Sequence, residues 1–206
     1  MTAKVQAKHK VSRRLGVNLW GDPKSPFNTR PTKPGQHGKN ARRKKISSYG
    51  THLIEKQKIQ FYYDMKEKQF KRFFKNAYKK KNVVETFFGE LESRLDTVVF
   101  RAKWAPTIFA AKQMVKHRHV LVNGKLVNIS SYLVKTGDVI SLVDRMKNHQ
   151  IVLSSLERAN KEVPAYYETS TDDKAVTFLK VPTIAEIPYP FELNPSLLVE
   201  FYSRKM

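Results

Sequence analysis

The apolar positions between residues 91 and 143 change from a helical to a strand spacing along the chain. The segment begins with apolar side chains at helical spacing, namely Leu91, Leu95, Val98, Val99 and Ala102. This spacing predicts one helix, on which Arg94 and Arg101 lie two turns apart on another face. The first part of the segment therefore combines a packing face with two cations on one predicted helix.

A second helix is predicted directly afterwards. Pro106 suits a first helical turn because it has no N–H to leave unpaired. The apolar side of this helix consists of Ile108, Ala111, Met114 and Val115. Lys112, Lys116 and His119 are spaced so that they form a basic edge beside that side, with His119 at the boundary to the next element.

A hairpin and another strand follow. Asn123-Gly124 is a dipeptide that supplies the positive φ angles of a type I′ turn, and it separates strands at residues 120–122 and 125–127. Gly137-Asp138 then precedes a strand at residues 139–143. Two helices that present cations beside a small hairpin suit a phosphate backbone, and the alternative is a helical core with a solvated charged edge.

Two further helices are predicted on either side of Asp64, in a stretch rich in lysine and aromatic residues. The aromatic residues Phe70, Phe73, Phe74 and Tyr78 have the spacing of a buried helix face, so we expect core packing rather than base stacking. Cations surround them, and the expected RNA contacts are Lys68, Lys71, Arg72, Lys75, Lys79, Lys80 and Lys81.

The first 50 residues are basic and rich in proline. Four prolines lie between residues 21 and 38, so this stretch is expected to be extended and irregular. Arg13 and Arg14 precede it, and His37 leads into a cluster of cations at Lys39, Arg42, Arg43, Lys44 and Lys45. The cluster taken alone fits a solvated or localisation-type charge run, but beside an irregular segment it favours contact with phosphates.

The last 60 residues are different in character. Residues 146–162 are polar with some helical character, and a turn at residues 171–174 precedes a predicted strand at residues 176–181. Residues 197–202 are apolar enough for a packed strand or a short helix. The acidic character of this region indicates that it faces away from nucleic acid or toward a basic protein neighbour.

Charge is distributed unevenly along the 206 residues. The net charge is +21, and residues 1–88 carry 23 basic and 5 acidic side chains. Such an excess implies a polyanionic partner. No apolar run approaches the roughly 20 residues that a membrane-spanning helix needs. The basic N-terminus also fits a transit peptide, but the motifs described below begin within it.

The sequence contains no recognisable constellation of catalytic residues. It has no cysteine, no phosphate-cradling glycine loop and no His-Glu-x-x-His pair. His117 and His119 lie close in sequence, but no third metal ligand is near, so an RNA-facing or packing pair is the preferred interpretation. We therefore expect no enzyme, no cofactor and no metal.

Several sequence islands resemble known ribosomal proteins. LESRLDTVVFR, AAKQMVKH, VLVNG and GDVI, in this order, are similar to the small RNA-binding module named after ribosomal protein S4. SRRLG, PGQHG, YGTHLIEKQKIQFYYDMKEKQF and IPYPFELNPSLLVEFYSR resemble the flanks of the S4 family itself. Trp20-Gly21 and the Pro-Thr-Ile-Phe stretch at residues 106–109 resemble its alphaproteobacterial or mitochondrial branch.

The resemblance implies an α+β fold in which a helical first domain is completed by the C-terminal tail. An inserted RNA-binding module of two helices and short antiparallel strands forms the second domain. The expected limits are 1–50 for a basic irregular extension, 51–90 with 182–206 for the helical domain, and 91–181 for the module. The N-terminal cysteines that hold zinc in many family members are absent between residues 16 and 33, so no zinc is expected.

The resemblance also implies a function. The family binds small-subunit ribosomal RNA at a helix junction of the 5′ domain early in assembly and lies near the messenger-RNA entry side. Its neighbours are the small-subunit proteins numbered three and five, and it is not a homo-oligomer. The expected location is the ribosome of a mitochondrial matrix or a bacterial cytoplasm.

The docking edge expected for the module has nine members: Arg94, Arg101, Lys112, Gln113, Lys116, His117, Arg118, Asn123 and Lys125. Two alternatives remain at this point. One is an RNA-modifying enzyme that uses the module as an anchor, for which the rest of the chain would have to supply a catalytic domain. The other is a basic protein that binds DNA or a membrane surface.

Overall fold

The computed structural model describes residues 7–38, 46–157, 163–170 and 174–203. The chain forms two compact units, Met1–Glu67 with Tyr189–Met206 and Lys68–Pro188. The predicted domain limits stay a prediction. Within the described residues, no helix is both long enough and apolar enough to cross a membrane.

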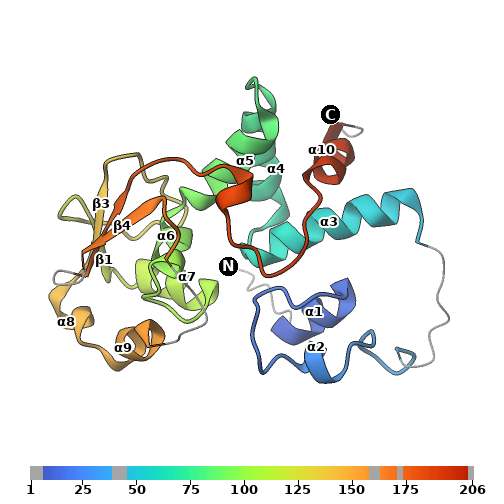
Figure 1. Ribbon diagram of the computed structural model, residues 1–206, viewed down its shortest axis with the longest axis horizontal. Helices are drawn as coiled ribbons and strands as arrows, with labels where there is room; N and C mark the ends of the chain where they lie inside the picture. Colours follow the sequence, from blue (N-terminus) through green and yellow to red (C-terminus); the bar gives the residue numbers. More distant parts are fainter. Residues whose placement is uncertain (1–6, 39–45, 158–162, 171–173, 204–206) are drawn as a thin grey trace. The chain divides into compact units, whose positions relative to one another are not determined.

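The first unit is helical. It contains α1 (Lys8–Leu15), α2 (Pro26–Thr29), α3 (Ser48–Tyr62) and α10 (Pro195–Ser203), and α10 packs along α3 (Figure 1). His52 on α3 lies 2.9 Å from Glu200 on α10, and the Tyr63 hydroxyl lies 2.6 Å from that of Tyr189. The C-terminal tail therefore completes the helical unit, as predicted, and residues 197–202 form a helix rather than a strand.

The irregular stretch predicted at residues 21–38 contains one short helix, so the prediction was wrong for that part. Pro26 occupies the first turn of α2, where its missing N–H has no helical partner to lose. The Ser25 hydroxyl accepts a hydrogen bond from the Phe27 N–H and caps the helix. The prolines were thus compatible with a helix start, whereas the rest of the stretch is irregular.

The second unit begins with most of α4 (Glu67–Tyr78), and α3 and α4 lie on either side of Asp64, as predicted. Asp64 has a φ of 47°, in the left-handed region that aspartate tolerates better than most residues. Phe70, Phe73 and Phe74 are buried, which confirms their packing role, but Tyr78 is 46% exposed and was wrongly placed in the core.

The single helix predicted over residues 91–102 is instead two helices, α5 (Val83–Glu92) and α6 (Leu95–Arg101). Arg94 between them has extended backbone angles and forms an isolated β-bridge with Leu133. The N–H of Leu95 donates to the Tyr132 carbonyl, and that of Val134 donates to the Ser93 carbonyl. This distant segment satisfies the backbone groups that the break exposes, which makes the break stable.

α7 (Ile108–Lys116) follows, and its apolar side is buried as predicted. Pro106, however, precedes the helix instead of forming its first turn. Thr107 is the N-cap, and its hydroxyl accepts a hydrogen bond from the Ala110 N–H at 3.1 Å. A capping hydroxyl therefore sets the start of the helix.

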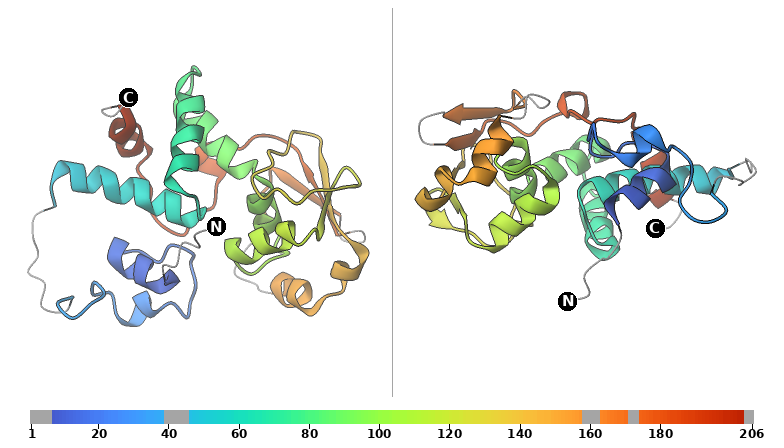
Figure 2. Two further views of the ribbon diagram at one scale, coloured as in Figure 1. Left: turned by 180° about the vertical axis from the view of Figure 1, so that it is seen from behind. Right: turned by 90° about the horizontal axis from the view of Figure 1, so that it is seen from below.

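The strands form one antiparallel sheet of order β2-β1-β3-β5-β4, with α6 and α7 to one side of it (Figure 1 and Figure 2). The strands are β1 (Val120–Val122), β2 (Lys125–Leu126), β3 (Val139–Leu142), β4 (Tyr167–Ser170) and β5 (Ala175–Phe178). Alternate residues of β1, β3 and β5 are buried, so one face packs on the core. The strand predicted at residues 176–181 ends earlier, at Phe178.

The predicted polar helical stretch contains α8 (Asp144–Lys147) and α9 (Gln150–Leu156), and a 3-10 turn, η1 (Ile184–Glu186), follows the sheet. The predicted turn at residues 171–174 lies largely outside the described residues. The α+β fold with an inserted module of helices and antiparallel strands is confirmed.

Candidate nucleic-acid interface

The end of α7 presents exposed polar and basic side chains. Gln113, Lys116, His117 and Arg118 are all exposed, whereas Lys112 is half-buried with its Nζ atom 3.9 Å from a carboxylate oxygen of Asp96. Arg118 has a φ of 59°, and the next N–H, of His119, donates back to the Met114 carbonyl at 3.1 Å. This left-handed helix end turns the chain sharply and leaves the two residues at positions 117 and 118 on the surface.

The hairpin beside α7 has the predicted turn. Asn123 and Gly124 have φ angles of 49° and 75°, as a type I′ turn requires. The Asn123 side chain accepts from the Val139 N–H at 2.9 Å and donates to Asp138 at 2.8 Å. Its amide therefore ties the turn to β3, whereas the neighbouring Lys125 is exposed.

Arg94 and Arg101 do not lie on this edge, and this corrects their predicted place. Arg94 is 1% exposed and Arg101 is 7% exposed. The Arg94 guanidinium donates two hydrogen bonds to the Asp96 carboxylate, at 3.0 and 2.6 Å. Because Asp96 is fully buried, a phosphate cannot replace it without opening the core.

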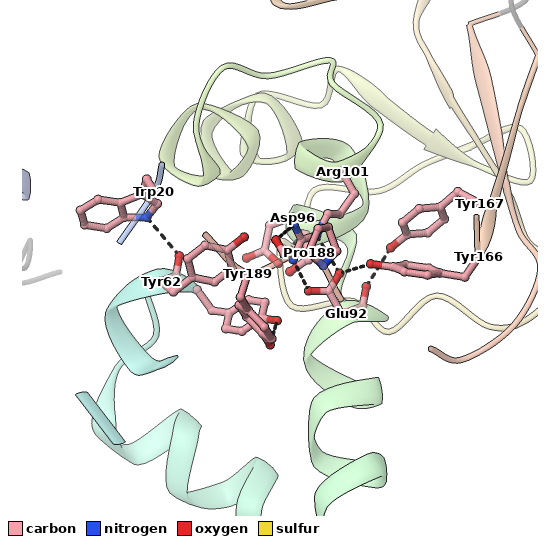
Figure 3. Close-up of polar contacts among 11 residues, drawn as sticks. Trp20, Tyr62, Glu92, Asp96, Arg101, Tyr166, Tyr167, Pro188 and Tyr189 are labelled. Carbon is pink, nitrogen blue, oxygen red and sulfur yellow. Dashed lines mark hydrogen bonds and ion pairs between the residues drawn. The ribbon is translucent and has the colours of Figure 1, made fainter. Parts of the chain in front are cut away.

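Arg101 belongs to a second buried network, centred on Glu92 (Figure 3). Its guanidinium donates to both carboxylate oxygens of Glu92, at 2.9 and 2.8 Å, and to the Pro188 carbonyl at 3.3 Å. Glu92 also accepts from the Tyr166 hydroxyl at 2.9 Å, and its backbone carbonyl accepts from the Tyr167 hydroxyl at 3.1 Å. The network joins α5 and α6 to Tyr166 and Tyr167, at the start of β4, and to Pro188, which follows η1.

The two tyrosines of this network are held neutral. Burial, reinforced by the Glu92 charge, raises the pKa of both Tyr166 and Tyr167 well above the ordinary value of 10.0. A hydroxyl that stays protonated remains a donor to the carboxylate. The network is therefore structural, because each of its buried charges has a partner of opposite charge.

A second basic surface of the unit lies on α4. Lys68, Lys71, Arg72 and Lys75 are exposed on the side opposite its buried phenylalanines. Their spacing of three and four residues places them along one face of the helix. The exposed residues Lys79, Lys80 and Lys81 follow, and Lys80 lies 3.8 Å from Glu90.

The predicted cations of the N-terminal unit are only partly described. Arg13 is half-buried and donates to the Thr32 carbonyl at 3.0 Å, while Arg14 is exposed with its guanidinium 5.5 Å from the centre of the Phe61 ring. His37 is exposed. Lys39 and the four cations at Arg42, Arg43, Lys44 and Lys45 lie outside the described residues.

The structure adds a residue to the module's edge that the sequence pattern did not indicate. The guanidinium of Arg145, on α8, lies 3.1 Å from Nδ1 of His119. The two residues are 26 positions apart, and no periodicity links them. Among the residues that the structure describes, no group of three or more His, Cys, Asp or Glu side chains is placed to hold a metal ion.

Two family models match consecutive parts of the chain. The model of the ribosomal protein S4/S9 N-terminal domain matches residues 4–92, and the S4 domain model matches residues 93–140. The second match covers α6, α7, the hairpin and the start of β3. The fold and its exposed basic edge therefore define an RNA-binding protein of the S4-domain class.

Comparison with curated proteins gives the family. The chain is 47% identical to small ribosomal subunit protein uS4 of Ehrlichia canis over 201 residues, which are 97% of this chain and 99% of that one. It is 48% identical to the proteins of the same name from Ruegeria sp. and Phenylobacterium zucineum, over 99% and 98% of this chain and 100% of each of theirs. The chain belongs to the uS4 family of small ribosomal subunit proteins.

This membership confirms the predicted family and its alphaproteobacterial affinity. The protein has a structural role in the small ribosomal subunit in translation, and its S4 domain is an RNA-binding domain.

Proposed function

We propose that the protein binds small-subunit ribosomal RNA at a helix junction of the 5′ domain, early in assembly. It lies near the messenger-RNA entry side, beside the small-subunit proteins numbered three and five. It works in the ribosome of a bacterial cytoplasm or a mitochondrial matrix and catalyses no reaction. These details follow the family resemblance and go beyond family membership.

One observation supports the RNA contact most directly. The second unit keeps its two most buried arginines in carboxylate pairs, while many other cations remain on its surface without a carboxylate within 4.0 Å in the described residues. The latter include Lys116 and Arg118 at the end of α7 and Lys71, Arg72 and Lys75 on α4. Such surfaces gain most from a phosphate backbone, since each phosphate neutralises charge and releases counterions.

We propose contacts on three surfaces. The first surface is the edge formed by Lys112, Gln113, Lys116, His117, Arg118 and Lys125. The second is the exposed side of α4, and the third is the N-terminal segment with Arg14, His37, Lys39 and the cations at positions 42–45. Arg94, Arg101, Arg13 and Asn123 are assigned to internal hydrogen bonds instead.

Quantitative binding to small-subunit ribosomal RNA tests this proposal. The affinity should fall steeply with salt, with each phosphate contact contributing roughly 0.7 to 0.9 to the log-log slope. Competition with random RNA of equal length provides the control. A flat salt dependence, or equal affinity for random RNA, would contradict the proposal.

Two further measurements test where the protein is located and whether it modifies ribosomal RNA. In a sucrose gradient the protein should sediment with small subunits, and sedimentation with free DNA or membranes would favour the alternative partners. Mass spectrometry of ribosomal RNA nucleosides, with and without the protein, should give the same nucleosides. A modification that depends on the protein would show an enzyme instead.

A further inference from the structure

Three histidines and an arginine gather where α7 ends and α8 and α9 begin. This histidine–arginine cluster consists of His117, His119, Arg145 and His149. The Arg145 guanidinium lies 3.1 Å from Nδ1 of His119, and the rings of His117 and His119 meet edge to face at 5.9 Å. The Val143 N–H donates to the His119 carbonyl at 3.1 Å, which fixes the start of α8 beside His119.

The hydrogen bond to Arg145 defines the protonation of His119. A guanidinium can only donate, so Nδ1 of His119 must accept and cannot carry a proton. His119 is therefore neutral in this arrangement. The Nδ1 atom of His149 accepts a hydrogen bond from the Ile151 N–H at 3.2 Å, which holds its ring at the start of α9.

The surroundings of His119 also oppose its charged form. Burial lowers the pKa of His119, and the positive charge of the neighbouring Arg145 lowers it further, with smaller contributions from His117 and His149. The other charges on these elements are Lys112, 3.9 Å from Asp96, and Lys116 on α7, Arg118 directly after it, and the pair of Lys147 with Asp144, at 2.9 Å, on α8. Lys174 lies at the end of α8, where its Nζ atom donates to the Asn148 side chain at 3.3 Å. The cluster therefore collects positive charge around a histidine that an anion would allow to protonate.

The cluster is accessible to a large ligand. Arg145, His117 and His149 are exposed, and His119 is half-buried between them. Lys116 and Arg118, which belong to the edge proposed above for RNA, are adjacent in sequence to His117 and His119. The cluster is therefore continuous with that edge. The ligand that these groups recognise is an anion with several oxygens, because guanidinium and imidazolium groups donate to such oxygens from several directions.

We propose that the histidine–arginine cluster binds a backbone phosphate of ribosomal RNA and takes up protons from water as it does so. This inference rests on the proposed function, since the RNA must lie on the adjoining edge. The phosphate engages the Arg145 guanidinium, which leaves Nδ1 of His119 free to accept a proton. The phosphate charge then stabilises the imidazolium form of His119.

The free and phosphate-bound states of the protein determine how its affinity for RNA depends on pH. The pKa of His119 is lowered in the free protein and rises when the phosphate is bound, so the complex holds more protons than the free components. Affinity must therefore rise as the pH falls. A rise of about one pKa unit on binding changes Kd by at most about tenfold.

The test measures Kd of the full chain for small-subunit ribosomal RNA at constant salt between about pH 8 and pH 5.5, a range around the ordinary pKa of histidine. The affinity of the wild-type protein should increase about three- to tenfold toward acid pH. His119→Gln, which keeps a polar side chain that does not titrate, should lose most of this increase. His9→Gln, the matched change at a half-buried histidine of the other unit, should keep the pH dependence of the wild type.

Arg145→Gln provides a second measurement. It should reduce the log-log salt slope by roughly 0.7 to 0.9, the contribution of one phosphate contact, at neutral pH. Lys180→Gln, which removes a cation elsewhere in the same unit, should leave the slope unchanged. In the free protein, titration of the histidines by NMR should show that Arg145→Gln raises the pKa of His119 toward the ordinary value.

The outcomes separate this inference from the proposed function. Specific wild-type binding with a flat pH profile would overturn the inference alone. The inference would also fail if His9→Gln removed the pH dependence and His119→Gln did not, or if Arg145→Gln and Lys180→Gln gave the same slope as the wild type. Absence of specific ribosomal RNA binding at every pH would overturn both.

Discussion

Arginines of the second unit serve two opposite purposes within 25 residues of sequence. Arg94 and Arg101 are buried against Asp96 and Glu92, whereas Arg118 is exposed at the end of α7. The Arg101–Glu92 pair joins α6 to α5, and the Arg94–Asp96 pair is buried at the start of α6. Removing one member of either pair would leave an unpaired charge in the core. Arg118 has no such partner within the described residues and remains available to a phosphate. A cation in a basic protein is thus a binding residue only when the fold leaves it on the surface.

The largest effect is expected from the removal of Arg101. Arg101→Met should lower the free energy of unfolding by about 3 to 5 kcal/mol, because the Glu92 carboxylate is left buried without its cation. Chemical denaturation measures this loss. If the variant folds, its salt slope for RNA binding should equal that of the wild type. A reduced salt slope in a fully stable variant would mean that Arg101 contacts RNA.

The next effect concerns the tyrosine of the same network. Tyr166→Phe removes a hydrogen bond to a charged group and should cost about 1.5 to 3 kcal/mol at neutral pH. Because the pKa of Tyr166 is raised in the folded protein, its contribution is complete below the ordinary value of 10.0 and is lost as the pH rises above it.

The wild-type protein should therefore lose stability more steeply than Tyr166→Phe above about pH 10, the ordinary tyrosine pKa. Denaturation at several alkaline pH values measures the difference. Tyr132→Phe is the matched control, since Tyr132 is only half-buried. Parallel pH profiles for the wild-type protein and Tyr166→Phe would show that Tyr166 does not titrate with the network.

The smallest effect on stability is expected for the exposed cations at the end of α7. The double change of Lys116 and Arg118 to Gln should alter the free energy of unfolding by no more than about 0.5 kcal/mol, as for most surface substitutions. The salt slope for ribosomal RNA should nevertheless fall by roughly 1.4 to 1.8, two phosphate contacts. The control variant changes Lys135 and Lys180 together to Gln, which removes the same charge elsewhere in the second unit. An equal decrease for both pairs would mean that net charge, not this edge, sets the affinity.

Local sequence patterns were sufficient for much of the fold. The Asn123-Gly124 turn, the boundary between two helices at Asp64 and the buried phenylalanines of α4 were all predicted, because each depends on residues within a few positions of one another. The family resemblance supplied the completion of the first unit by the C-terminal tail, which no local pattern indicates.

The missed features depend on distant partners or on capping. The break between α5 and α6 is held by two backbone hydrogen bonds, from the Leu95 N–H to the Tyr132 carbonyl and from the Val134 N–H to the Ser93 carbonyl. The helical spacing from Leu91 onward does not reveal this break. The burial of Arg101 follows from its pairing with Glu92 and from a tyrosine hydroxyl 74 residues after that carboxylate. Arg145 joins the candidate site in the same way, by tertiary contact alone.

The Glu92 network also sets an order for folding during synthesis. Arg101 can pair with Glu92 soon after both emerge, but its hydrogen bond to the Pro188 carbonyl joins residues 87 positions apart. At roughly 5 to 20 residues per second, that partner arrives about 4 to 17 s later. The RNA-binding edge at residues 112–125 is therefore synthesised well before the buried charges of Glu92 and Arg101 have all their partners. A nascent chain stalled at residue 140 should expose Glu92 to water, and one released after residue 188 should not.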